Sequence, residues 1–103
     1  MSIDMKIAEV FSHFIGEVLT LVESTPVSRE KQESLKRLME RKIYDVRNGM
    51  MDGENDSLIN NMQYRLKTYA SVTLQPKELS EAFDRALDII VNDLKGALKN
   101  ENI

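Results

Sequence analysis

The chain has no cysteine, no tryptophan, one histidine and two prolines among its 103 residues. Without cysteine it can form neither a disulfide nor a thiolate metal site. A di-iron helical bundle needs a Glu-x-x-His motif on each of two helices, which one histidine does not supply. No apolar run approaches the roughly 20 residues that cross a bilayer. These absences predict a soluble, cytoplasmic protein with no metal or other cofactor and no membrane partner.

The residues that are present are typical of a small globular protein. Hydrophobic residues make up 42% of the chain and charged residues 30%, which distinguishes it from a disordered chain. The length predicts a single helical domain over residues 1–103. Because only six residues are Phe or Tyr, we expect an aliphatic core rich in methionine.

The clearest pattern is an apolar stripe near the end of the chain, in which Leu79, Phe83 and Leu87 begin a series of three- and four-residue steps. This spacing puts the side chains on one face of a helix. One helix cannot bury that face alone, so the stripe requires partner helices. Similar patterns and their stop signals predict helices over residues 3–23, 29–48, 57–72 and 76–99.

Short connections between these segments favour antiparallel neighbours, so the predicted fold is all-α, a small antiparallel four-helix bundle. Asn48-Gly49 is a helix stop signal, because glycine readily adopts a positive φ. The end of the third helix near residues 71–75 stays open, since Ser71-Val72-Thr73-Leu74 also suits an extended chain. The apolar stripes of 29–48 and 57–72 are narrow, which leaves room for a homodimer.

The net charge of −3 is unevenly spread, with −3 over residues 1–25 and +3 over residues 28–49. A basic helix at 29–47 suits either an acidic protein surface or the phosphates of a nucleic acid. Four interleaved acids and a sequence pI of about 5.2 favour the protein partner. The best candidates on this helix are Lys36, Arg37, Arg41 and Lys42.

Three further residues are candidate anchors for a partner. Tyr64 lies off the apolar stripe of its helix, so we expect it to be exposed. Met50 and Met51 flank a polar loop and either tuck back onto the core or stay exposed, and they are candidates if exposed. Tyrosine and methionine are adaptable contact residues that bury much apolar area.

A catalytic interpretation rests on His13, which has Glu9 and Glu17 four residues before and after it. A carboxylate can orient an imidazole for acid–base chemistry or metal binding. The sequence offers no further ligand set and no serine nucleophile motif beside them. The favoured interpretation is therefore a solvated histidine that pairs with a neighbouring carboxylate.

Taken together, these patterns predict no catalytic, cofactor-binding or metal-binding residues. We expect a non-enzymatic helical module that binds a protein partner and acts as a regulator, inhibitor, immunity-type factor, chaperone or adaptor. The alternative is a nucleic-acid-binding regulator, acting as a homodimer, that uses the basic helix 29–47.

Overall fold

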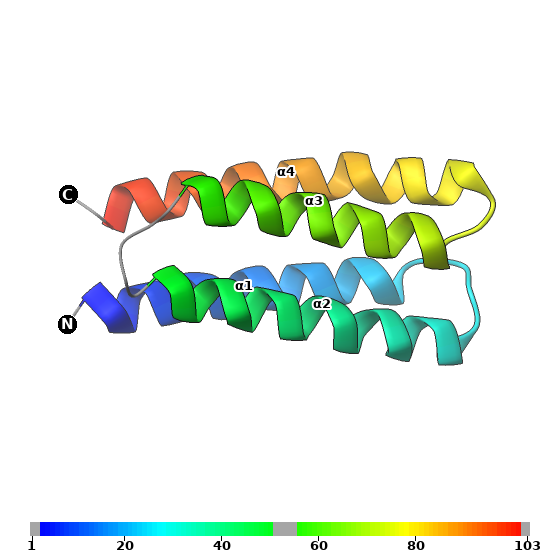
Figure 1. Ribbon diagram of the computed structural model, residues 1–103, viewed down its shortest axis with the longest axis horizontal. Coiled ribbons are helices and arrows are strands. Elements are labelled where there is room, and N and C mark those ends of the chain that lie inside the picture. The colour runs from blue at the N-terminus through cyan, green and yellow to red at the C-terminus, as the bar shows by residue number, and fades with distance from the viewer. Residues whose placement is uncertain (1–2, 51–55, 102–103) are drawn as a thin grey trace.

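The computed structural model describes residues 3–50 and 56–101. They form four helices: α1 (Ile3–Glu23), α2 (Arg29–Met50), α3 (Asp56–Thr73) and α4 (Lys77–Glu101). The helices run alternately in opposite directions along an elongated body of 42 × 20 × 18 Å (Figure 1). The described residues contain no strand. The predicted antiparallel four-helix bundle is confirmed.

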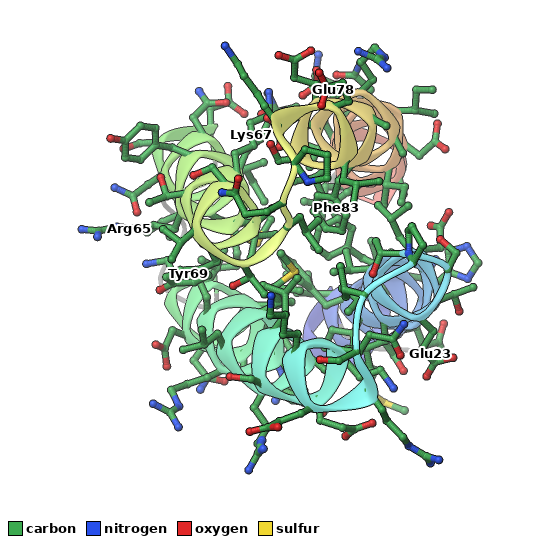
Figure 2. All side chains as sticks on the ribbon, turned by 90° about the vertical axis from the view of Figure 1, so that its right-hand side faces the viewer. Glu23, Arg65, Lys67, Tyr69, Glu78 and Phe83 are labelled. Carbon is green, nitrogen blue, oxygen red and sulfur yellow. The ribbon has the colours of Figure 1, made fainter. Side chains whose placement is uncertain are left out.

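The four helices pack as a ring around a common core. α1 packs against α2 and α4, and α3 packs against the same two helices. We call the outer line along which two adjacent helices meet a seam. Viewed down the bundle axis, the α1/α4 seam and the α2/α3 seam lie on opposite sides of the molecule (Figure 2).

The core is filled from all four helices, mostly by aliphatic side chains and methionines, as the composition predicts. Its only close aromatic pair in the described part of the chain is Phe11 with Phe14, whose rings meet edge to face with centroids 6.3 Å apart. The largest fully buried side chains are Phe11, Phe14, Val18, Leu35, Met39, Ile43, Ile59, Met62, Leu66, Leu74, Phe83 and Leu87.

The turn between α1 and α2 is held by polar contacts from its own residues. Ser28 is the N-cap of α2, because its Oγ accepts a hydrogen bond from the backbone N–H of Lys31 at 3.2 Å. The Gln32 amide donates to the Thr25 carbonyl at 2.8 Å, which ties the first turn of α2 to the preceding loop.

The predicted end of the second helix at Asn48-Gly49 is wrong, because α2 continues to Met50. Gly49 is helical and does not adopt a positive φ. A Cβ atom at Gly49 would lie 3.1 Å from Cδ1 of Leu58, so the glycine instead permits close packing of α2 against α3.

The same extension overturns Met50 as a candidate contact residue, because Met50 is only 4% exposed. Met50 continues the buried stripe of Met39, Ile43 and Val46 by one more turn. Burial of this side chain outweighs the local stop signal. Met51 lies outside the described residues.

Both ends of α1 and the start of α2 are as predicted, and the ends of α3 and α4 differ from the predicted ones by one or two residues. The stretch after Ala70 stays helical through Thr73, and Leu74 is buried in the connection to α4. Packing of Leu74 beneath the turn explains why the β-branched run does not become extended.

A core substitution should separate burial from helix propensity. Leu66→Ala should lower the free energy of unfolding by about 2–5 kcal/mol, because it leaves a cavity among fully buried side chains. Tyr64→Ala, on the same helix but exposed, should change it by less than about 0.5 kcal/mol. Urea unfolding followed by circular dichroism measures both, and equal effects would contradict the assigned core.

Candidate functional site

The α3/α4 seam is closed by polar bridges. The Asp88 carboxylate accepts hydrogen bonds from the Gln63 amide at 2.6 Å and from the Lys67 ammonium at 2.7 Å. Further along, the Lys95 ammonium donates to the Asn60 side-chain oxygen at 2.9 Å. Figure 2 shows Lys67 extending from α3 toward α4. These contacts engage five polar side chains of this seam within the molecule.

Two carboxylates of α4 titrate differently because of this arrangement. The hydrogen bond from Lys67 lowers the pKa of Asp88 below its ordinary value. One turn earlier, burial raises the pKa of Asp84, and its Oδ1 atom is buried without a hydrogen-bond partner.

The α1/α2 seam is bridged in the same way. The Lys36 ammonium pairs with the carboxylates of Glu23 and Glu33, and the hydrogen bond that it donates to Glu23 raises the pKa of Lys36. Lys36, a predicted partner-binding residue, is therefore engaged inside the molecule.

Elsewhere on α2, the Arg47 guanidinium lies 5.5 Å from the centroid of the Tyr44 ring.

The α2/α3 seam has no such bridge, since no hydrogen bond or ion pair joins the described residues of these two helices. The contact between Gly49 and Leu58 sets the antiparallel register. Lys42 lies seven residues before Gly49, and Arg65 lies seven residues after Leu58, so these two side chains are level across the seam. One turn further on, Leu38 is level with Tyr69.

These residues make a surface that is basic and partly apolar. We define the basic face as Leu38, Arg41, Lys42, Arg65, Tyr69 and Val72. Val72 is 75% exposed and Leu38 is also exposed, whereas Tyr69 is half-buried against the core. Its three cations have no ion-pair partner among the described residues.

Some of the predicted site residues fall on or beside this face. Arg41 and Lys42 belong to it, and Tyr64 borders it on the outer side of α3, with 68% of its surface exposed. Arg37 is exposed one turn before Arg41 and donates from Nε to the Glu33 carbonyl.

Sequence reasoning missed Arg65, Val72 and the exposure of Leu38. Arg65 has only Lys67 as a basic neighbour in a segment of slightly negative charge, so no basic cluster indicates it. Leu38 follows Leu35 by three residues, which favours burial, but it lies one residue from Met39 and thus about 100° around the helix. Only the register between α2 and α3 brings these residues together.

His13 lies on the outer surface of α1, where its side chain is 81% exposed. Its Nε2 atom is 3.3 Å from the Glu17 carboxylate, and Glu9 is exposed one turn away. Within the described part of the chain, no group of three His, Cys, Asp or Glu side chains is placed to hold a metal ion.

Charge is divided between the two halves of the ring. Counted within the helix bounds, formal charge is −3 on α1 and −2 on α4, but +3 on α2 and +1 on α3. The α1/α4 side of the molecule is thus acidic, and the opposite side is basic.

Comparisons with protein-family models, with curated proteins and with solved structures found no match to this chain. Among the described helices, none is both long and apolar enough to cross a membrane.

The Lys67–Asp88 bridge should give a measurable pH dependence. Because the pKa of Asp88 is lowered in the folded state, its contribution is present above the ordinary carboxyl pKa and is lost as the pH falls through that range. Asp88→Asn should cost less than about 1 kcal/mol at neutral pH, since the pair is partly exposed.

Urea unfolding measures the stability of wild type and of Asp88→Asn, near neutrality and near pH 3. The difference in free energy of unfolding between the two proteins should be smaller in acid. Asp93→Asn, an exposed site on the same helix, is the control. A difference that is independent of pH would contradict the assignment.

Proposed function

We propose that the protein is a non-enzymatic interaction module whose basic face docks on an acidic surface of a protein partner. The supporting observation is that Arg41, Lys42 and Arg65 lack acidic partners among the described residues and share the basic face with exposed Leu38 and Val72. A module of this kind acts by occupying its partner's surface, as an inhibitor, regulator or adaptor does.

Ion pairing within the chain engages several lysines of the molecule but none of the cations of the basic face. Lys36, Lys67 and Lys77 each pair with a carboxylate of this chain. Arg41 and Lys42 have Asp45 one turn away on their own helix, yet neither pairs with it. These cations therefore remain available to carboxylates of another molecule.

The two kinds of residue on this face would contribute differently to binding. Cations at the edge of an interface mainly accelerate and orient the encounter. Exposed apolar and aromatic side chains contribute most of the affinity once water is excluded around them. Val72, Leu38 and Tyr64 are the exposed anchors, and Arg41 and Arg65 supply the charge complementarity.

Charge reversal tests the proposal. The double variant Arg41→Glu/Arg65→Glu should lower recovery of the partner at least about fivefold, because two attractive contacts become repulsive. Both positions are exposed, so the fold should be unchanged by circular dichroism. Affinity purification from the native host, quantified by mass spectrometry, measures recovery.

Arg85→Glu is the matched control, since it reverses an exposed arginine on α4, away from the basic face. At least one protein should be recovered equally with wild type and with this control, but be depleted with the double variant. Equal recovery of every protein with all three baits would refute the proposal.

Nucleic acid is the second candidate, and Arg65 favours it because it extends the basic surface from α2 onto α3. Glu40 and Asp45 on α2 count against phosphate binding, which places it second. Fluorescence anisotropy with a labelled duplex of about 20 base pairs, at about 50 mM salt, distinguishes the two. Binding that is lost in the double variant would favour nucleic acid, and no binding would exclude it.

A further inference from the structure

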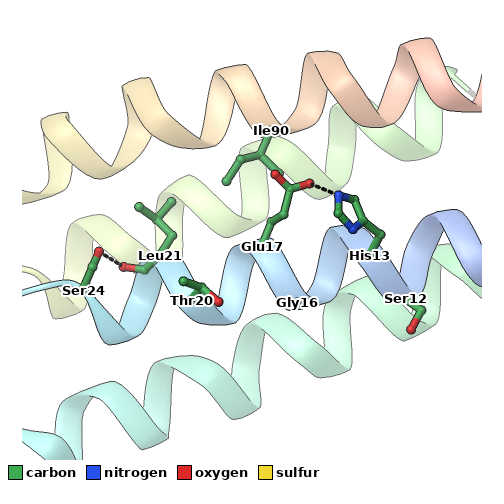
Figure 3. A pocket seen from close by; sticks show the side chains of 8 residues that line it. All are labelled: Ser12, His13, Gly16, Glu17, Thr20, Leu21, Ser24 and Ile90. Carbon is green, nitrogen blue, oxygen red and sulfur yellow. Dashed lines mark hydrogen bonds and ion pairs between the residues drawn. The ribbon is translucent and has the colours of Figure 1, made fainter.

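The α1/α4 seam, on the side opposite the basic face, carries an open groove. It has a volume of about 680 Å³ and lies along the outer surface of α1, beside α4. Seven of its eight lining residues come from residues 12–24, among them His13, Gly16 and Glu17, and the eighth is Ile90 of α4 (Figure 3). Between residues 10–23 of α1 and 79–97 of α4, no hydrogen bond or ion pair joins the two helices.

Two smaller depressions extend this groove along the seam. One, of about 90 Å³, shares His13 and Glu17 with it and reaches Val10. The other, of about 150 Å³, shares Leu21 and Ser24 with it. From Val10 to Ser24 the seam runs roughly 20 Å at 1.5 Å per residue, the length of a helix of about 14 residues.

Gly16 leaves the middle of the groove without a side chain. A Cβ atom at this position would meet nothing within 4 Å, so no contact within the described chain requires glycine there. Glycine inside a helix is less favourable than alanine. An absent side chain on an exposed groove allows the backbone of another helix to approach closely.

The charge around the groove selects what can lie in it. Asp93 and Glu17 stand at its edge, and Glu17 also contacts His13, whose Nε2 atom lies 3.3 Å from the carboxylate. The helices that form the groove carry formal charges of −3 and −2. Ile89, which is 65% exposed, lies four residues before Asp93 on the same side of α4. A complementary occupant therefore needs an apolar strip flanked by cations.

We infer that the α1/α4 groove is a second docking site, which takes a basic amphipathic helix of a partner protein. The occupant's apolar strip would cover Gly16, Ile89 and Ile90, and its Lys or Arg side chains would reach Glu17 and Asp93. A symmetric dimer through this face is disfavoured, because it would bring two acidic surfaces together. With the basic face on the opposite side, one molecule could hold two partners of opposite charge at once.

The probe is a labelled synthetic peptide of about 18 residues, an amphipathic helix with an Ala/Leu face and lysines on its polar face. A second peptide has glutamate in place of every lysine. Fluorescence anisotropy at about 50 mM salt should show the lysine peptide binding wild type at least about tenfold more tightly than the glutamate peptide.

Gly16→Leu should weaken binding of the lysine peptide at least about tenfold, because the new side chain fills the groove. Gly96→Leu is the matched control: a Cβ there also meets nothing within 4 Å, and Gly96 does not line the groove. It should bind the peptide as wild type does. Thermal unfolding should show that both variants are folded, since leucine favours helix over glycine.

Three results would overturn the inference: equal binding of the two peptides, no binding of either, or unchanged binding by Gly16→Leu. Sedimentation velocity tests whether a second copy of this chain occupies the groove instead. Self-association that Gly16→Leu abolishes would identify that second copy and would also overturn the inference. Arg41→Glu/Arg65→Glu should not weaken the lysine peptide, so failure of this site and failure of the basic face can be told apart.

Discussion

The mutual burial of four apolar stripes is the interaction on which the rest of the structure depends. Each helix contributes its stripe to one shared core, where side chains such as Phe11, Leu66 and Leu87 are fully buried. Ser80 is the one polar residue buried among the described side chains, and its hydroxyl donates to the Lys77 carbonyl. Since the interior is apolar, recognition must take place at the seams and on the outer helix faces.

The order of charges along the chain decides which seams are closed. In an antiparallel ring, acidic α1 lies beside basic α2, and α3 lies beside acidic α4, so Lys36–Glu23 and Lys67–Asp88 can form across them. The other two seams join helices of like charge. No polar bridge joins the described residues of α2 and α3, or residues 10–23 of α1 and 79–97 of α4. The two candidate docking surfaces are thus a consequence of topology applied to an uneven charge distribution.

Sequence periodicity was sufficient to predict the helices, because each stripe repeats at three- and four-residue steps over several turns. The local stop signal at Asn48-Gly49 gave the wrong helix end, because burial of Met50 and the approach of Leu58 from another helix outweigh it. For the site, periodicity predicted exposed Tyr64. It could not predict that Lys67 contacts Asp88, or that Lys42 lies level with Arg65. Both placements depend on the register between helices.

The separation of charge across the bundle also gives the molecule a transverse dipole moment. An approaching charged body would exert a torque on it before any side chains touch, turning α2 and α3 toward an anionic surface and α1 and α4 toward a cationic one. Orientation would then be partly selected during diffusion rather than after collision, within about one Debye length of the partner. This alignment weakens as the ionic strength rises, because salt screens the electrostatic field of the partner.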